Sequence, residues 1–209
     1  MAQIELKNIN KKFDQKEIFH DFKLSIDKGE FLGIKGESGK GKTTLLNMIG
    51  LMEPCDGTIT YDGKVISARD LKKVRKLHRE KIGYLFQNFA LIDDLTVYDN
   101  LKIVLDKVPK KEKRQCMITE LVKVGFDETI LDKKIFQLSG GEQQRIATVR
   151  LMLKKSEIIL ADEPTGSLDE KNSKIIMELL KKLNEEKKTI IMVSHDERTF
   201  SYCSRVITL

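Results

Sequence analysis

The chain has 209 residues and a mass of 24.0 kDa; hydrophobic residues make up 40% of it and charged residues 33%. This composition is typical of one soluble globular domain, or of a core with one inserted subdomain, and it excludes a wholly disordered chain. No window reaches the ~18 apolar residues that a membrane-spanning helix needs, and the first residues contain no apolar signal stretch. We therefore expect a chain that stays where it is made and does not span a bilayer.

The charged residues are 38 lysines and arginines and 32 acids, a net charge of +6. Such an excess suits nucleic acid or an anionic membrane surface, but the basic residues are mixed with acids along the whole chain, which favours solvated faces. Aromatic residues make up only 6%, without tryptophan, so a base-stacking surface has little support. The odd number of cysteines, without C-x-x-C spacing, argues against disulfides and zinc and fits a reducing cytosol: Cys55, Cys116 and Cys203.

In chain order, the sequence predicts three strands before a glycine-rich turn. Residues 2–9 alternate apolar and polar side chains, as a half-buried strand does. Two more strand candidates follow at 20–27 and 30–35. A turn at 36–41 then leads to a helix that begins at Lys42.

The next segment, 57–66, predicts a hairpin with Asp62 and Gly63 at its turn. A helix is predicted near 170–186, and a further short helix precedes the last strand. The remaining predicted strands lie at 82–86, 158–161, 189–193 and 205–208. Strands that alternate with helices imply a parallel sheet covered on both faces.

The middle of the chain has a different pattern, which becomes helical from about residue 96 to 153. Met117, Leu121 and Val124 recur at helical spacing, and Pro109 suits a first helical position. We interpret this helical middle as an insertion between two halves of the parallel sheet.

The glycine-rich turn matches the phosphate-loop pattern G-x-x-x-x-G-K-[ST], and its position between a predicted strand and a predicted helix argues against a chance match. Glycines let the backbone bend so that successive N–H groups point at one phosphate, and the following helix adds its positive N-terminal end. Lys42 would reach the β- and γ-phosphates, and the Thr43 hydroxyl would bind Mg²⁺. The predicted nucleotide-binding residues here are Gly36, Glu37, Ser38, Gly39, Lys40, Gly41, Lys42, Thr43 and Thr44.

Two acids, Asp162 and Glu163, follow the apolar strand predicted at 158–161. Open α/β sheets bind ligands at the carboxyl ends of their strands. Asp162 could hold Mg²⁺ through water, and Glu163 could orient or deprotonate an attacking water. The alternative is a solvated corner between a strand and a loop.

A third motif, Leu138 followed by Ser139, Gly140, Gly141 and Glu142, lies between the other two. Alone it would be an ordinary turn before a helix, with Ser139 as the cap. With the phosphate loop before it and the acid pair after it, the chain resembles an ATP-binding cassette (ABC) ATPase over essentially its whole length. The resemblance implies that these residues, from Ser139 to Glu142, contact the ATP held by a second copy of the chain, packed head to tail.

The resemblance extends to further residues. Gln87 resembles the Q-loop glutamine, which implies a catalytic role and a place among the Mg²⁺ ligands. His195 resembles the switch histidine that contacts the γ-phosphate, and Ser167-Leu168-Asp169 resembles the D-loop. Phe13 resembles the aromatic residue that stacks on adenine. The alternatives are ordinary surface positions for Gln87 and His195 and packing within the sheet for Phe13.

The family resemblance implies an α/β fold in which a P-loop NTPase (RecA-like) core carries an N-terminal antiparallel β-subdomain and an inserted α-helical subdomain. Residues 1–209 would form a single ABC ATPase domain, with the core at 1–87 and 158–209. The helical subdomain, with the LSGGE motif, would cover 88–157. In ABC transporters the stretch that matches 88–100 also lines the groove that receives a cytoplasmic helix of the membrane subunit.

The sequence departs from the commonest family pattern at two positions: Lys40, where serine is frequent, and Glu142, where glutamine is frequent. Neither change removes a required group. Many relatives continue beyond the last predicted strand, so we expect this chain to be either naturally short or truncated at Leu209.

The segments 86–92 and 162–169 are similar to those of ATPases that serve lipoprotein release, macrolide export and bacteriocin export. This likeness implies an ATPase with ATP and Mg²⁺ as cofactors, which dimerises on ATP and drives a separate permease that exports a peptide, a bacteriocin or a similar amphipathic compound. Such a subunit is cytoplasmic and peripheral on the inner face of the cell membrane. It joins the membrane only through the permease and does not contact nucleic acid directly.

Two other classes remain as alternatives. A soluble ABC ATPase that acts on ribosomes or DNA usually carries two cassettes or a long coiled coil, whereas this chain has one cassette and no sustained heptads. An ordinary P-loop kinase or GTPase would leave the LSGGE motif and His195 unexplained.

Overall fold

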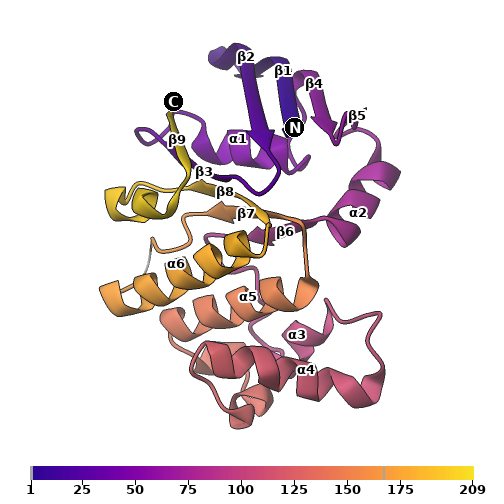
Figure 1. Cartoon of the computed structure of the whole chain (residues 1–209), viewed down its shortest axis with the longest axis vertical. Coiled ribbons are helices and arrows are strands. Elements are labelled where there is room, and N and C mark those ends of the chain that lie inside the picture. Colours follow the sequence, from indigo (N-terminus) through magenta and orange to yellow (C-terminus); the bar gives the residue numbers. More distant parts are fainter. Residues whose placement is uncertain (1, 167) are drawn as a thin grey trace.

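The computed structural model describes residues 2–166 and 168–209, which form two β-sheets and a set of helices. A four-stranded antiparallel sheet, in the order β2-β1-β4-β5, lies at one end of the molecule (Figure 1). Its strands are β1 (Ala2–Phe13), β2 (Lys16–Asp27), β4 (Asp56–Tyr61) and β5 (Lys64–Val65). This sheet is the antiparallel subdomain that the family resemblance implies.

The first hairpin is longer than the sequence pattern predicts, because β1 extends to Phe13 and β2 begins at Lys16, directly opposite. Side chains at this end of the hairpin are exposed or half-buried, so no alternation of burial marks them, and register shifts interrupt the ladder. Pairing between the strands, rather than burial of one face, forms this end. The predicted β4–β5 turn is confirmed, and Asp62 and Gly63 both have the positive φ of a tight hairpin, 49° and 74°.

The second sheet has five parallel strands in the order β6-β7-β8-β3-β9. All five were predicted from the sequence as strands, and β7 and β8 are buried along their whole length. Strands covered on both faces lose the polar half of the alternation and become continuous apolar runs. The bounds are β3 (Phe31–Lys35), β6 (Ile82–Leu85), β7 (Ile158–Asp162), β8 (Thr189–Val193) and β9 (Arg205–Thr208).

Helix α1 (Lys42–Ile49) lies between the two sheets (Figure 1). Its side chains Leu45, Leu46 and Ile49 are fully buried, in one hydrophobic cluster with residues of both sheets. Burial of these side chains fixes α1 against the parallel sheet, and with it the turn that precedes the helix.

The opposite end of the molecule is helical (Figure 1). Side chains such as Val97, Leu121 and Ile146 form a hydrophobic cluster there. Helix α5 also gives Ala147 and Leu151 to a cluster with the parallel sheet, so it joins the helical end to that sheet. The elements are α3 (Val97–Lys102), α4 (Lys110–Lys123), two 3₁₀ helices (Glu128–Asp132 and Ile135–Gln137), α5 (Gly140–Lys154) and, against the sheet, α6 (Glu170–Glu185).

One helix, α2 (Leu71–Glu80), was not predicted from the sequence. Its apolar residues Leu71, Val74 and Leu77 are spaced three apart, as on one face of a helix, but lysines and arginines lie between them and only Leu77 is buried. Pro109 precedes α4 instead of occupying its first turn, a difference of one position. The predicted short helix before β9 is a 3₁₀ helix, Glu197–Tyr202. Within the described ranges, no helix is both long and apolar enough to cross a membrane.

Candidate functional site

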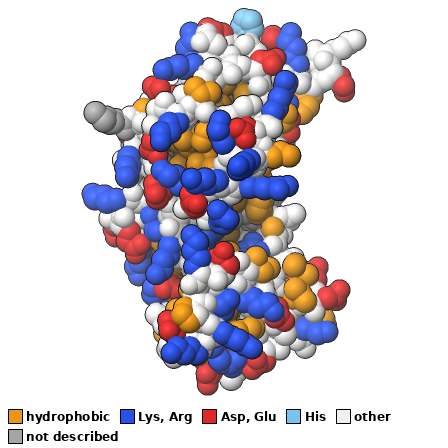
Figure 2. All heavy atoms as spheres, turned by 90° about the vertical axis from the view of Figure 1, so that its right-hand side faces the viewer, with side chains coloured by type: hydrophobic (Ala, Val, Ile, Leu, Met, Phe, Trp, Pro, Cys, Tyr) orange, Lys and Arg blue, Asp and Glu red, His pale blue; other side chains and the backbone are white. Residues whose placement is uncertain are grey.

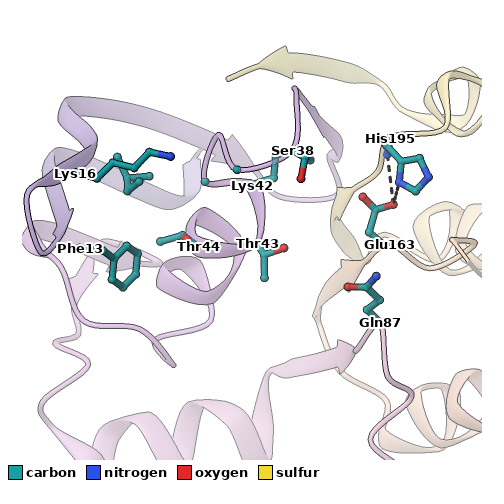
Figure 3. Close-up of a pocket in the computed structure, with 12 residues that line it drawn as sticks. Phe13, Lys16, Ser38, Lys42, Thr43, Thr44, Gln87, Glu163 and His195 are labelled. Carbon is teal, nitrogen blue, oxygen red and sulfur yellow. Dashed lines mark hydrogen bonds and ion pairs between the residues drawn. The ribbon is translucent and has the colours of Figure 1, made fainter.

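A cavity of about 640 Å³ lies where strands of the parallel sheet end (Figure 3). The turn after β3, Gln87 after β6, Glu163 after β7 and His195 after β8 all line it. The antiparallel sheet contributes three more side chains. The lining residues that the sequence predicted are Phe13, Ser38, Gly39, Gly41, Lys42, Thr43, Thr44, Gln87, Glu163 and His195; Lys16 and Ile18 were not predicted.

The phosphate loop needs glycine at position 41 for two reasons. Gly41 has a φ of 94°, which side chains rarely allow, and a Cβ there would lie 2.4 Å from the Cγ2 atom of Ile18. Gly41 is also the N-cap of α1, which has neither a side-chain cap nor an acid in its first turn. Because the first N–H groups of a helix lack intrahelical acceptors, those of α1 are left to bind an anion in the cavity.

The Lys42 ammonium group lies across the same loop. Its Nζ atom donates to the carbonyl oxygens of Gly36 and Glu37, at 2.7 and 3.0 Å. Gly36, Glu37 and Lys40 were predicted to bind nucleotide, but they line a neighbouring cavity of about 480 Å³, which also includes His195. In this structure Gly36 and Glu37 therefore position Lys42 through their carbonyl groups, and the Lys40 side chain, 56% exposed, points elsewhere.

Thr43 and Asp162 lie together, with the Thr43 Oγ1 atom donating to Asp162 Oδ1 at 3.1 Å. Burial raises the pKa of the Asp162 carboxyl, and the negative charge of Glu163 adds to this effect, whereas the Thr43 hydrogen bond and the Lys42 charge oppose it. A hydroxyl and a carboxylate are the hard oxygen donors that Mg²⁺ prefers.

Glu163 points away from Asp162 and toward His195. Its φ of 48° is a left-handed conformation, which turns the chain sharply after β7. The Glu163 Oε2 atom lies 2.8 Å from His195 Nδ1 and accepts a bond from the His195 backbone N–H at 3.3 Å. The Glu163 side chain is only 12% exposed, and Figure 3 shows it between His195 and Gln87. The carboxylate is thereby oriented within the cavity.

Phe13 and Lys16 lie at the other end of the cavity, with Thr43 and Thr44 in between (Figure 3). The Phe13 ring is 45% exposed, so it is not packed inside the sheet, and the Lys11 ammonium lies 4.6 Å from its centroid. The sequence analysis missed Lys16 because it began the second strand at residue 20. Lys16 pairs directly with Phe13 across the hairpin, and this pairing, which no residue pattern marks, brings it to the cavity.

The LSGGE motif does not line this cavity. Ser139 caps α5 in a capping box, in which its N–H and hydroxyl each donate to Glu142 Oε2 at 2.8 Å. The bonds from Ser139 lower the pKa of the Glu142 carboxyl. Ser139 and Gly140 are exposed, so the start of α5 is a free surface of the chain.

The start of α5 packs against the segment that follows β7. Gln144 Nε2 donates to the Pro164 carbonyl at 2.8 Å, and the Arg145 guanidinium group contacts the Asn172 amide. Asp169 caps α6 by accepting from the Asn172 N–H at 2.8 Å. Ser167, the first residue of the predicted D-loop, lies outside the described residues.

The segment after Gln87 is held from two sides by residues that the sequence analysis missed. Arg150 of α5 donates to the carbonyl oxygens of Phe89 and Ala90, at 2.7 and 2.5 Å, where both residues have positive φ. The fully buried Asn100 of α3 accepts from the Ile92 N–H at 2.8 Å and donates to the Ile92 carbonyl at 3.1 Å. Because these partners are backbone groups, no residue pattern points to them.

The chain matches a known protein family and is similar to several known proteins. A family profile described as "ABC transporter" matches residues 19–166. The chain is 39% identical to the macrolide export ATP-binding/permease protein MacB of Campylobacter jejuni, over 99% of this chain and 32% of MacB. It is 38% identical to the bacitracin export ATP-binding protein BceA of Halalkalibacterium halodurans, over 99% of this chain and 85% of BceA. The chain thus spans about a third of MacB.

Among solved structures, the chain is similar to the dimeric ABC transporter cassette MJ0796, a protein of Methanocaldococcus jannaschii. The TM-score is 0.90 at 38% identity, over 99% of this chain and 94% of that one. A second dimeric structure of MJ0796, in a post-hydrolysis state with ADP and phosphate, matches with a TM-score of 0.89.

Proposed function

This chain belongs to the ABC transporter family, and from that premise we propose that it is the ATPase subunit of an exporter, working as an ATP-bound dimer on a separate membrane permease. The chain binds ATP and hydrolyses it to ADP and phosphate, as its family does.

In the proposed mechanism, the loop N–H groups and Lys42 bind the β- and γ-phosphates, and Phe13 stacks on the adenine. The Lys42 ammonium is already beside the loop, so binding exchanges its two carbonyl partners for phosphate oxygens. Glu163, oriented by His195, accepts a proton from the attacking water. Gln87 faces the same space and completes the arrangement around that water.

We propose Mg²⁺ as the metal cofactor. Thr43, Asp162 and Gln87 would hold it, and the 3.1 Å contact between Thr43 and Asp162 brings two suitable oxygen atoms together beside the cavity. The described residues contain no cluster of three histidine, cysteine, aspartate or glutamate side chains able to form a site by themselves. This suits a metal that takes its other ligands from phosphate and water. When bound, Mg²⁺ would neutralise charge on the phosphates.

The observation that carries the dimer proposal is the position of the LSGGE motif. Lys42 and Glu163 line the cavity, whereas Ser139 and Gly140 are exposed and lie outside its lining. A helix N-terminus with exposed glycine amides suits an anion, and a second chain packed head to tail would place this surface over the first chain's ATP. Each of two sites would then use residues from both chains.

A mixing experiment tests this arrangement. Lys42→Ala and Ser139→Phe should each lose ATPase activity, since one lacks the ammonium and the other blocks the capping surface. In a mixed dimer, Lys42 of one chain and Ser139 of the other remain together at one site, so mixing the two inactive proteins should restore activity. A mixture as inactive as its components would contradict the shared site. The matched negative control is Lys42→Ala mixed with Glu163→Gln. Because Lys42 and Glu163 line the cavity of the same chain, each site of this mixed dimer keeps one defect, and the mixture should stay inactive. Restored activity in this control would show that Glu163 acts on the ATP of the other chain.

The permease would dock in a groove between the helical end and the sheet. The lining residues of this groove lie outside the stretch 88–100, to which the family resemblance assigned it. A cavity of about 700 Å³ lies there, with an apolar lining that includes Ile103, Val104 and Met152 and a rim that includes Arg79 and Lys155. Ile103 is 55% exposed, although it is a large aliphatic residue. An apolar groove with a charged rim suits a short amphipathic segment of the permease. We propose that this segment is cytoplasmic, so that the chain sits on the inner face of the membrane through its permease.

Co-purification tests the docking. With a tagged candidate permease, wild type should co-purify, and Ile103→Glu should not, because a charge would be buried in the groove. Val122→Glu is the matched control, since Val122 is 62% exposed and outside the groove lining. Equal recovery of all three proteins would contradict the groove assignment.

The proposed cargo is a peptide, a bacteriocin or a similar amphipathic compound, in keeping with the relatives named for macrolide and bacitracin export. Cargo would contact the permease, so this chain's own residues would not select it. Stimulation of the ATPase by a panel of such compounds in the reconstituted complex is the measurement. Stimulation by none of them would reject the cargo class and leave the ATPase assignment intact.

A further inference from the structure

A second surface of the molecule has an unusual composition for a solvated face. Helix α2 and the β4–β5 hairpin enclose a cavity of about 430 Å³, a volume within the range of small-molecule sites. Its floor is apolar, formed by Tyr61, Ile66 and Leu77, of which Tyr61 and Leu77 are buried. Its charged lining residues are two acids, Asp62 and Glu80, and four lysines, Lys64, Lys73, Lys76 and Lys81.

The basic groups on this surface exceed their acidic partners. Helix α2 contains five lysines and arginines and one glutamate. Lys73 pairs with Asp70 at 3.0 Å, and Lys81 pairs with Asp62 and Glu157. In contrast, no acid of the described residues lies within 4 Å of four other cations: Lys64, Lys72, Arg75 and Lys76. These four groups are exposed and free to bind an external anion.

Large apolar side chains lie among these cations. Val65 is 61% exposed and Leu71 is 62% exposed, at the hairpin and at the first residue of α2. Figure 2 looks onto the face that carries β5 and α2, where lysine and arginine side chains, with fewer acids among them, surround an exposed hydrophobic area. A small soluble anion would use the cations alone, whereas a ligand with a charged head and an apolar tail would use both kinds of side chain.

The position of α2 indicates where such a ligand would be. Its last residues, Arg79 and Glu80, also line the groove proposed for the permease. The two sites therefore share a helix, and docking of the permease would bring α2 next to the membrane that the permease spans. This step rests on the proposed function, but the composition of the surface does not.

We propose that the surface formed by α2 and the β4–β5 hairpin binds acidic phospholipid, with Lys64, Lys72, Arg75 and Lys76 on the phosphate headgroups and Val65 and Leu71 in the interfacial layer. Basic amphipathic helices with exposed aliphatic residues bind anionic membrane surfaces in this way. The chain would then have two attachments to the membrane, one through the permease and one through lipid, whereas the family resemblance implied the first alone. The lipid contact would hold α2, and hence one wall of the groove, in place.

Vesicle sedimentation of the full chain, without permease, tests the proposal. Wild type should bind vesicles of phosphatidylcholine mixed with phosphatidylglycerol, and should not bind phosphatidylcholine alone. The variant Lys64→Gln, Lys72→Gln, Lys76→Gln should bind about a hundredfold more weakly, because each lysine near an anionic surface contributes about 1 kcal/mol. The control Lys174→Gln, Lys181→Gln, Lys182→Gln removes the same charge from exposed positions of α6 and should bind as wild type.

Further measurements distinguish insertion into lipid from attraction between charges alone. Val65→Ser with Leu71→Ser should weaken the binding that survives high salt, since salt screens only the charges. Hydrogen exchange of wild type on vesicles should show protection at 61–81. This measurement uses only the wild-type chain, so it does not depend on whether a variant folds. ATP binding by every variant should be unchanged.

Several results would overturn the proposal. Failure of wild type to bind the acidic vesicles is one, and an equal loss of vesicle binding by the lysine variants of α2 and α6 is another. Protection from hydrogen exchange at residues other than 61–81 would also contradict the proposal. An α2 variant that binds vesicles normally but no longer co-purifies with the permease would show that the surface contacts an acidic protein segment instead. The vesicle assay contains no permease, so its result bears on lipid binding alone. The co-purification of Ile103→Glu measures permease docking alone, so failure of this proposal and failure of the proposed function are distinguishable.

Discussion

The Nδ1 atom of His195 lies 2.8 Å from a carboxylate oxygen of Glu163, and the two residues come from the ends of neighbouring strands, β7 and β8. The contact uses one oxygen, Oε2, which also accepts the backbone N–H of His195. The other carboxylate oxygen is left for a water molecule. If Glu163 is ionised, its oxygen can only accept, so the Nδ1 atom of His195 must carry the proton in this hydrogen bond. The Nε2 atom of the ring is then left to face a ligand.

Glu163→Gln should therefore stop hydrolysis without stopping ATP binding. The amide keeps the size of the side chain but cannot accept a proton from water, so we expect the rate of phosphate release to fall by about 10²–10⁴-fold. Lys42, Thr43 and Asp162 remain, and loss of an anion near the γ-phosphate reduces repulsion. The variant should accumulate as an ATP-bound dimer in size-exclusion chromatography with ATP and Mg²⁺.

The outcomes of this experiment separate two claims. Hydrolysis by Glu163→Gln at the wild-type rate would show that another group is the catalytic base. Loss of hydrolysis by a protein that stays monomeric would support the base and contradict the ATP-bound dimer of the isolated chain. His195→Ala should also lower the turnover rate, because His195 orients Glu163. The effect on ATP affinity should be smaller, because His195 lies far from the end of the cavity where adenine would bind.

Lys42→Ala should weaken ATP binding by about 10- to 100-fold, the equivalent of one charge-assisted hydrogen bond of ~1.5–3 kcal/mol. Lys40→Ala is the matched control, because Lys40 is in the same loop but its side chain is 56% exposed and lies outside the cavity proposed to bind ATP. Titration with a fluorescent ATP analogue measures both. If the two variants lose affinity equally, net charge of the loop and not the position of Lys42 determines binding.

Asp162→Asn should make the ATP-free fold more stable while it lowers Mg²⁺-dependent hydrolysis. Burial raises the pKa of this carboxyl, so the group favours the fold below its unfolded pKa, and that contribution is lost as the pH rises through the folded pKa. At neutral pH the buried charge is a cost that asparagine removes. Thermal unfolding without nucleotide or Mg²⁺ should show a higher midpoint for the variant at neutral pH, and a difference that shrinks in acid. An unchanged or lower midpoint at neutral pH would contradict the cost.

Arg150→Ala should free the segment that follows Gln87. The variant loses the bonds to the Phe89 and Ala90 carbonyls, and we expect a stability loss of about 1–3 kcal/mol. Amide hydrogen exchange at 87–95 should become faster, and stimulation of the ATPase by the permease should fall more than ATP affinity does. Arg150→Lys retains one donor and should recover part of the protection. Exchange at 87–95 that matches wild type would show that Asn100 and local packing suffice to hold the segment.

The amino-acid sequence by itself determines the elements that carry a local signal. The parallel strands are continuous apolar runs, the glycine-lysine-threonine turn lies between a strand and a helix, and Asp62 with Gly63 specify the β4–β5 turn. Each of these elements depends on residues that are close together in the sequence. The strands depend on consecutive apolar residues, and the two turns depend on glycine and its neighbours. Most of the cavity lining was predictable for the same reason, since the residues follow strands of one parallel sheet: Ser38, Gly39, Gly41, Lys42, Thr43, Thr44, Gln87, Glu163 and His195.

Only the tertiary structure decides contacts between side chains and distant backbone, because a carbonyl group has no sequence signature. Arg150 with Phe89 and Ala90 is one case, and Lys42 with Gly36 and Glu37 is another. The extension of the first hairpin to Phe13 and Lys16 depends on strand pairing, and the basic helix α2 buries a single side chain, Leu77. Such elements are stabilised by their partners in the fold and not by their own periodicity, so they are visible only when those partners are in place.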